Sequence, residues 1–206
     1  MPTSFYARWI LPPLIDLAMR NREATRFRAE LVPQARGQVL EIGIGSGLNL
    51  PHYGPAVERL YGLDPSARLL ALARKRSRAG EFPVEFLERS AEAIPLADRS
   101  VDTVVCTFTL CSVPDPGAAL NEMRRVLRAD GTLLYAEHGL APEPAVQRWQ
   151  RRLNRYWRPL SGGCNMDRKM DALIAAAGFR MSEASAGYVK GPRVLAYVFA
   201  GRAERG

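Results

Sequence analysis

The stretch Val39-Leu40-Glu41-Ile42-Gly43-Ile44-Gly45-Ser46-Gly47 decides the fold, because an apolar run typical of a buried strand breaks into three alternating glycines. Glycine adopts positive φ without steric cost and lets a ligand approach the backbone closely. The pattern therefore predicts a strand followed by a tight turn, with a nucleotide-like cofactor lying against that turn. The alternative is a tight strand-to-helix turn that binds no ligand.

Two residues of this stretch argue against a dinucleotide. The dinucleotide fingerprint G-x-G-x-x-G requires glycine at its sixth position, where this chain has Leu48. Glu41 lies just before the first glycine, and a carboxylate there would repel a pyrophosphate and favour a cationic ligand. S-adenosylmethionine (SAM) carries a sulfonium and an ammonium group and fits this requirement. An NAD-dependent enzyme stays as the less favoured alternative.

Length and charge limit the classes of protein that fit. A chain of 206 residues with 47% hydrophobic content suffices for one well-buried domain, expected over 1–206. The net charge of +8 would suit nucleic acid or an anionic membrane. The excess is almost all arginine and is scattered, so no specific nucleic-acid partner is expected. A nucleic-acid-binding or nucleic-acid-modifying protein remains the alternative from a different class.

The cysteines and the apolar stretch near the N-terminus bear on the cellular compartment of the protein. Cys106, Cys111 and Cys164 form no C-x-x-C pair and no even disulfide count, which predicts a reduced, cytoplasmic protein without a metal site. The apolar stretch at 9–19 contains two prolines and an aspartate and is shorter than the roughly 20 residues of a membrane span. No secretory signal is expected, and peripheral contact with a membrane stays open.

Strand-like and helix-like patterns alternate along the chain, which predicts parallel strands joined by helical crossovers. An N-terminal helical segment is expected within 1–32, and substrate-side helices within 140–178. The expected strands span 38–42, 59–63, 84–87, 101–107, 132–136, 181–189 and 194–200. The expected helices run from Ser66 to Gly80, from Asp115-Pro116 to Gly131, over 143–158, and from Asp167 to Gly178.

Unusual residues follow the carboxyl ends of these strands, where open α/β sheets bind ligands. Asp64-Pro65 closes the second strand, about 20 residues after the glycines, where an acid can bind ribose hydroxyls. Its alternative role is to shape the turn before Ser66. After the third strand, Ser90-Ala91-Glu92 is expected beside the adenine edge. Thr107 is expected beside the methionine portion. The expected cofactor-binding residues are thus Glu41, Gly43, Gly45, Gly47, Asp64, Pro65, Ser90, Ala91, Glu92 and Thr107.

The same edge carries the chain's two histidines, His52 and His138. A histidine can remove a proton near neutral pH, so His138 is the expected catalytic base, with a hydrogen-bonded structural role as the alternative. Cys106 and Cys111 are expected as core or wall residues rather than nucleophiles, because the sequence shows no base beside them. The helix at 143–158 has an aromatic stripe among arginines, which suits either a lid over the site or a membrane-surface helix.

With these residues in place, the chain resembles the class I SAM-dependent methyltransferases. The resemblance rests on Leu40 to Gly47, on Asp64-Pro65, on Ser100 to Val105 and on Arg125 to Thr132. It implies a Rossmann-like α/β fold: a mostly parallel seven-stranded sheet with an antiparallel last strand and helices on both faces. It also implies that the glycines hold the methionine end of SAM and that the acid holds its ribose.

A narrower resemblance is to the alkyl-thiol S-methyltransferases. It rests on Val105-Cys106-Thr107 through Leu110-Cys111-Ser112-Val113, on Glu137-His138 and on Gly163-Cys164-Asn165. It implies a small acceptor, a thiol or hydrosulfide, with Cys111, Trp157, Cys164 and Asn165 lining the acceptor side. O-, N- or C-methylation of a lipid, quinone or other small molecule is the alternative. The chain differs from that group in two ways. Its sequence does not show the hydrophobic N-terminal anchor of that group, which leaves membrane attachment open. Ser90 stands where many class I enzymes have an adenine-binding acid.

Overall fold

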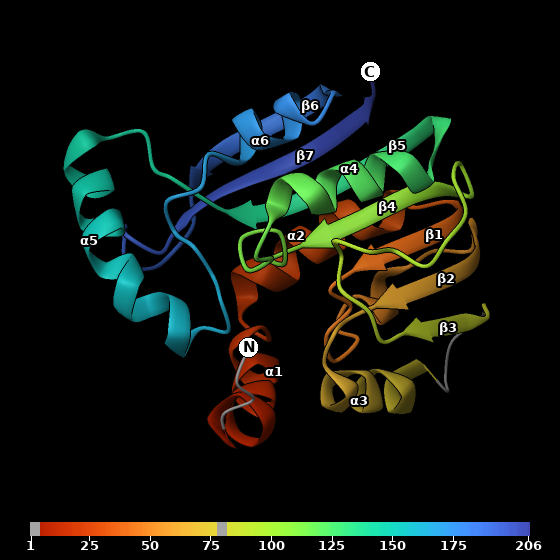
Figure 1. The fold of residues 1–206 in the computed structure, drawn as a ribbon, viewed down its shortest axis with the longest axis horizontal. Coiled ribbons are helices and arrows are strands. Elements are labelled where there is room, and N and C mark those ends of the chain that lie inside the picture. The colour runs from red at the N-terminus through yellow and green to blue at the C-terminus, as the bar shows by residue number, and fades with distance from the viewer. Residues whose placement is uncertain (1–4, 78–81) are drawn as a thin grey trace.

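The computed structural model describes residues 5–77 and 82–206, without the side chains of residues 7 and 8. In this part of the chain, seven strands form one sheet in the order β3-β2-β1-β4-β5-β7-β6 (Figure 1). The strands are β1 (Gly37–Ile42), β2 (Val57–Leu63), β3 (Val84–Leu87), β4 (Val101–Thr107), β5 (Leu127–His138), β6 (Phe179–Tyr188) and β7 (Tyr197–Arg205). Strands β1 to β5 are parallel, and β7 is antiparallel to both of its neighbours. The expected α/β fold is confirmed.

Helices cover both faces of this sheet. They are the π-helix η1 (Tyr6–Ile10), the 3₁₀ helices η2 (Val32–Gln34) and η3 (Leu50–His52), and the α-helices α1 (Leu11–Ala18), α2 (Arg22–Leu31), α3 (Ala67–Ser77), α4 (Pro116–Val126), α5 (Pro144–Leu160) and α6 (Met170–Ala176). Leu40 and Ile42 of β1 pack in one core cluster with α4 and α6, whereas Val39 packs in a second cluster with α3. Alternate residues of β1 therefore face opposite layers, as in parallel sheets buried on both faces.

Two helices lie beyond the sheet. Figure 1 shows α1 and α5 at the end toward which the arrows of β1 to β5 point. Tyr6, the first residue of η1, donates a hydrogen bond from its hydroxyl to the Leu160 carbonyl at 2.9 Å, which joins the N-terminal helices to α5. In the described residues, no helix is both long and apolar enough to cross a bilayer. The N-terminal helices and α5 thus lie together beyond the carboxyl ends of these strands.

Local signals predicted some element boundaries well. Asp115 caps α4, accepting a hydrogen bond from the Ala118 amide at 3.0 Å, and Pro116 occupies the first turn as expected. Ser66 accepts a long hydrogen bond of 3.4 Å from the Leu69 amide at the start of α3. The expected end of this helix at Gly80 lies outside the described residues.

Other boundaries were wrong where strand pairing sets them. The expected helix to Gly131 ends at Val126, because Leu127 already pairs with Val101 and begins β5. The expected strand 194–200 is displaced: β7 spans Tyr197–Arg205, in register with β5. The helix expected from Asp167 begins at Met170. Pairing with distant strands, which local periodicity does not contain, decides these ends.

Candidate active site

A cavity of about 660 Å³ lies at the carboxyl ends of β1, β2, β4 and β5. It is lined by the glycine turn, by the ends of these strands, by α1 and by the end of α5 with the loop that follows. Of the residues expected at the site, Glu41, Gly43, Gly45, Asp64, Pro65, Ser90, Ala91, Thr107, Cys111, His138, Trp157 and Cys164 line it. Segments from six parts of the sequence therefore share one cavity.

The glycines of the turn serve different purposes. Gly45 has φ +55°, and a Cβ added there would meet only the Gly43 carbonyl oxygen, at 3.8 Å. The space above Gly45 is therefore open to a ligand. A Cβ on Gly43 would overlap the Thr109 side chain at 2.2 Å, so this glycine allows two loops to touch. Gly47 does not line the cavity, because it packs inward, where a Cβ would lie 2.7 Å from Leu50.

Asp64 ties the glycine turn to the end of β2. One carboxylate oxygen accepts a hydrogen bond from the Gly45 amide at 3.0 Å, and the other accepts one from the Ser66 amide at 2.8 Å. Burial raises the pKa of Asp64 to about 6, although both backbone hydrogen bonds lower it. The side chain thus shapes its turn and also borders the cavity, so the two roles expected from the sequence are compatible.

Glu41 is the centre of a buried polar network. Its carboxylate accepts hydrogen bonds from Asn49 at 2.9 Å and from the Tyr53 hydroxyl at 2.8 Å. Asn49 also accepts from Arg28 at 3.0 Å and donates to Thr107 at 3.0 Å. Burial raises the pKa of Glu41 to about 7, and the Tyr53 and Arg28 contacts oppose this rise. The negative field expected of Glu41 is therefore partly offset by a neighbouring guanidinium.

The loop after β3 contributes only part of its expected set. Ser90 and Ala91 line the cavity, but Glu92 does not. Glu92 accepts hydrogen bonds from the Ser90 hydroxyl at 2.8 Å and from the Asp115 amide at 2.7 Å. Its carboxylate therefore fastens this loop to the start of α4, a contact that sequence spacing does not reveal.

Two thiols and an imidazole form a cluster on the wall of the same cavity. The ligand atoms of Cys111, His138 and Cys164 all lie within 4.8 Å of one another. A hydrogen bond with Cys111 and the nearby His138 lower the pKa of Cys164 to about 5, against the opposing effect of burial. Cys111 lines the cavity wall, and β5 brings beside it a base, His138, that the sequence alone did not reveal. Cys106 lies apart, with its thiol 3.4 Å from the buried Glu137 carboxylate.

Two buried polar residues position this cluster. Glu137, which is fully buried, accepts hydrogen bonds from the amides of Thr109, Leu110 and Cys111 at 2.8, 2.9 and 3.1 Å. Asn165 donates to the Cys111 carbonyl oxygen from its backbone amide at 2.8 Å and from its side chain at 3.0 Å. Asn165 was expected on the cavity wall, but it does not line the cavity. Its side chain turns instead toward the loop that follows β4.

Sequence reasoning missed the contribution of α1. Asp16, nearly buried, accepts hydrogen bonds from Arg76 at 2.9 Å, from Arg20 at 2.5 Å and from the Ser46 hydroxyl of the glycine turn. These three hydrogen bonds outweigh burial and lower the pKa of Asp16 to about 2. An aspartate inside an otherwise apolar helix was the signal, and it marks the point where α1 is fastened over the cavity.

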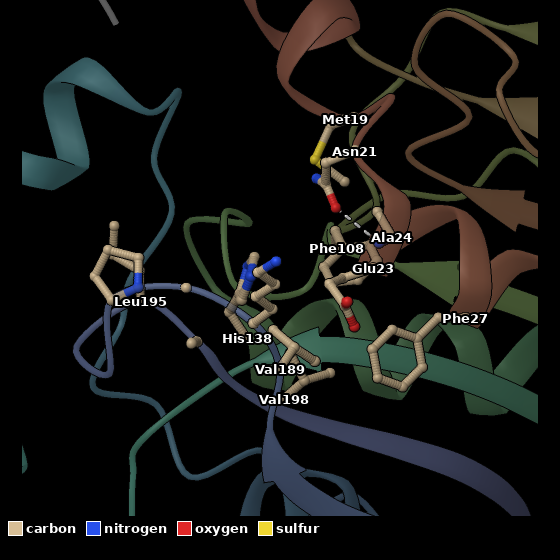
Figure 2. Close-up of a pocket in the computed structure, with 14 residues that line it drawn as sticks. Met19, Asn21, Glu23, Ala24, Phe27, Phe108, His138, Val189, Leu195 and Val198 are labelled. Atoms are coloured by element: carbon tan, nitrogen blue, oxygen red, sulfur yellow. Dashed lines mark hydrogen bonds between the residues drawn. The ribbon is translucent and has the colours of Figure 1, made fainter.

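A second cavity, of about 150 Å³, lies between α2 and the loop before β7. Figure 2 shows His138 beside Phe108. Both residues line both cavities, as does Leu195. The Phe108 and His138 rings lie 5.0 Å apart between centroids. His52 lines neither cavity, and burial lowers its pKa. Only one of the two histidines therefore reaches the site.

Comparisons with known proteins place these features in a family. A family model described as a methyltransferase domain matches residues 40–135. The chain is 32% identical over 170 residues to human thiol S-methyltransferase TMT1A, covering 80% of this chain and 69% of that protein. It is 36% identical over 137 residues to a phosphatidylethanolamine N-methyltransferase of Cereibacter sphaeroides, covering 65% of this chain and 66% of that protein. Other curated thiol S-methyltransferases are matched over 59% to 66% of their length.

The fold is shared with solved structures. A methyltransferase of Haloferax volcanii, solved in complex with the Trm112 methyltransferase activator, superposes with a TM-score of 0.72. The match covers 95% of this chain and 97% of that chain at 19% sequence identity. At this identity the likeness supports the fold alone.

Proposed function

Because the chain belongs to the class I SAM-dependent methyltransferases, with SAM as its cofactor, we propose that it transfers the methyl group to a sulfur acceptor, a thiol or hydrosulfide. The observation that carries the proposal is the position of His138 and two cysteines on the cavity that the glycine turn also lines. The relative TMT1A is named a thiol S-methyltransferase. The acceptor sulfur would thus lie in the same cavity as the cofactor-binding turn.

The cofactor contacts in this proposal follow the cavity wall. The open space above Gly45 takes the methionine portion of SAM, and Asp64 with Pro65 borders the ribose. Ser90 and Ala91 border the adenine, with Ile94 buried behind them. Each of these residues lies at the carboxyl edge of the sheet, so one extended ligand can contact all of them.

The chemistry asks the protein mainly for alignment. The acceptor sulfur attacks the methyl carbon in line with the breaking bond to the sulfonium, and alignment alone can contribute about 7–11 kcal/mol. A thiolate and a sulfonium neutralise each other as the methyl group moves, so a cavity shielded from water favours the step. His138 accepts the proton of the acceptor thiol or stabilises its thiolate.

The test is a transfer assay with methyl-labelled SAM and three acceptors: an alkyl thiol, a quinol and phosphatidylethanolamine. We expect label in the thioether only, and a loss of at least about 100-fold in rate for His138→Ala. His52→Ala is the matched control, because His52 lines neither cavity. Label in the quinol or the lipid with none in the thiol would refute the sulfur acceptor and leave methyl transfer standing.

A lipid acceptor is the second candidate, because an apolar surface borders the cavity. The exposed apolar side chains of the N-terminal helices and of α5 include Phe5, Trp9, Leu14, Leu17, Trp149, Tyr156 and Leu160. The two groups adjoin, since Leu11 and Ile15 of α1 contact the position of Gly162, just after α5. The arginines of α5 add positive charge, which suits an anionic membrane surface.

We therefore propose that this surface makes peripheral contact with membranes. The wild-type chain should sediment with vesicles that contain phosphatidylserine more than with neutral vesicles. Leu17→Glu, at a position 68% exposed, should reduce this binding, whereas Glu30→Gln on the neighbouring helix should not. Equal recovery with both vesicle types would contradict the proposal.

Two further aspects complete the proposed function. All three cysteines are free, which suits a reducing compartment such as the cytoplasm. Nucleic acid is not a proposed substrate, so binding to RNA or DNA should be weak and lost as salt is raised. Tight binding of one sequence at high salt would favour the nucleic-acid alternative instead.

A further inference from the structure

Cys111, His138 and Cys164 come from three separate segments. Cys111 lies in the loop after β4, His138 is the last residue of β5, and Cys164 lies in the loop between α5 and α6. Their sulfur and nitrogen atoms nevertheless lie within 4.8 Å of one another. Cys111 and His138 are 27 positions apart in the sequence, and His138 and Cys164 are 26 apart. No short metal-binding motif therefore marks them.

The three side chains are held in place by contacts outside the cluster. Glu137 fixes the backbone at Cys111 through the Cys111 amide, and Asn165 fixes the loop of Cys164 to the Cys111 carbonyl. Gly163 makes this approach possible, since it has φ +104° and a Cβ there would lie 2.9 Å from the Ser112 carbonyl oxygen. The two sulfur atoms thus converge because the backbone is organised to bring them together.

We propose that Cys111, His138 and Cys164 bind a zinc ion, and that the sulfur of the methyl acceptor occupies its fourth coordination position. Two cysteines and a histidine form a ligand set of catalytic zinc sites, which leave one position open. At a Zn–S distance of about 2.3 Å, tetrahedral sulfur ligands lie about 3.8 Å apart. The observed limit of 4.8 Å therefore requires rotamer adjustments of about 1 Å or less.

The open position faces the cofactor. All three residues line the cavity that Gly43 and Gly45 also line. This inference rests on the proposed function, because it assigns zinc the task of activating a thiol. A zinc ion with two thiolates and a neutral imidazole has no net charge. A bound acceptor thiolate makes the complex anionic, which keeps the sulfur nucleophilic near neutral pH.

The reaction balances with SAM and the thiol alone. With zinc bound, His138 serves as a ligand and stabilises the thiolate through the metal instead of taking its proton. The acceptor thiol displaces a zinc-bound water and releases its proton to solvent. The thiolate lone pair then forms the new bond to the methyl carbon, and the bond from that carbon to the sulfonium breaks, with its electron pair going to the cofactor sulfur. The products are a thioether and S-adenosylhomocysteine. A neutral thioether is a poor zinc ligand, so water displaces it.

One polar group is placed to support zinc-bound thiolates. The indole nitrogen of Trp157 is buried without a hydrogen-bond acceptor at normal distance among the described residues. It lies near the Cys164 sulfur. An N–H group beside a ligating atom orients the ligand, and loss of such an outer contact typically weakens metal affinity by about 10- to 100-fold.

The experiment measures metal binding without any turnover. Metal-free reduced protein is titrated with Co²⁺ as an optical probe, and bound zinc is measured by mass spectrometry after dialysis against ZnCl₂. We expect one metal per chain with a thiolate-to-cobalt charge-transfer band. Cys164→Ser and Cys111→Ser should lose the band, and Trp157→Phe should weaken Co²⁺ affinity about tenfold. Cys106→Ser is the matched control and should bind as the wild type does, because its side chain pairs with Glu137 outside the cluster.

Thermal unfolding of each metal-free variant shows whether it is folded before the titration. A wild-type chain without the band, or a Cys164→Ser chain that retains it, would overturn the site. A Cys111–Cys164 disulfide in the isolated protein, with no Co²⁺ bound after reduction, would overturn it in favour of a redox pair.

The metal and the acceptor are tested separately by two comparisons. Full thiol methylation by metal-free protein would overturn the zinc proposal and leave the proposed function intact. Zinc binding as expected without methylation of any thiol would refute the acceptor in the fourth position and, with it, the sulfur acceptor of the proposed function.

Discussion

Replacing Asp16 by asparagine should loosen α1 from the cavity at a measurable cost. Asparagine keeps the shape of the side chain and one oxygen for Ser46, but it removes the charge that Arg76 and Arg20 pair with at 2.9 and 2.5 Å. The pKa of Asp16, lowered from 3.8 to about 2, corresponds to roughly 2–3 kcal/mol. Because Arg20 is 54% exposed, solvent screening reduces the expected loss to about 1–2 kcal/mol.

Urea unfolding, followed by circular dichroism, measures this loss directly. An acid with a depressed pKa contributes stability that is complete above its unfolded pKa and is lost as the pH falls through its folded pKa. The difference between wild type and Asp16→Asn should therefore be constant from pH 5 to 8 and shrink between about pH 4 and pH 2. Glu30→Gln is the control, since its pair with Arg26 is more than half exposed, and it should change stability by less than about 0.5 kcal/mol.

Cofactor affinity gives a second measurement on the same variant. Because α1 forms part of the cavity wall, Asp16→Asn should weaken binding of S-adenosylhomocysteine by up to about tenfold. Equal stability of the two proteins at pH 7, or a difference that grows on acidification, would refute the role of Asp16 in fastening α1.

The remaining predictions concern the cofactor side and the base. Gly45→Val should abolish SAM binding in calorimetry, because its side chain would fill the open space above the turn; binding at wild-type affinity would show that SAM lies elsewhere. Asp64→Ala should weaken SAM binding by about 10- to 100-fold through loss of charged hydrogen bonds, and unchanged affinity would show that Asp64 only shapes its turn. Burial raises the pKa of Glu41 from 4.5 to about 7, so the native state binds its proton more tightly than the unfolded chain, and the free energy of unfolding should fall by roughly 3 kcal/mol as the pH rises through this range. Glu41→Gln should flatten that slope in urea unfolding at several pH values, and an unchanged slope would assign it to another group. His138→Ala should lower kcat by about 100-fold or more with SAM affinity nearly unchanged, whereas full activity would remove His138 from the chemistry.

The fold was largely predictable because its strongest signals are local. The bounds of β3 and β4 agree with the sequence pattern, and the cap and proline at Asp115-Pro116 mark the start of α4. The ends of β5 and β7 were not predictable from local periodicity. They depend on pairing between residues such as Thr132 and Glu204, which are far apart in the sequence.

The residues of the candidate site also fall into a part that local sequence signals predicted and a part that they did not. The glycine turn and Asp64 follow directly from strand ends, and they border the cavity as the pattern indicates. The approach of Cys164 to Cys111 depends on a loop that Asn165 fastens by long-range hydrogen bonds. Asp16 reaches the glycine turn only because α1 folds back across the cavity. Such contacts arise from tertiary packing, so the types of residue involved were visible in the sequence but their grouping was not.

Calorimetric titration of S-adenosylhomocysteine into the folded wild-type chain tests most directly the claim that this cavity binds the cofactor. We predict one binding event that disappears in Gly45→Val and persists in Cys164→Ser, which lies on the acceptor side. A folded wild-type protein that gives no heat of binding, or a Gly45→Val variant that binds as tightly as the wild type, would contradict the account.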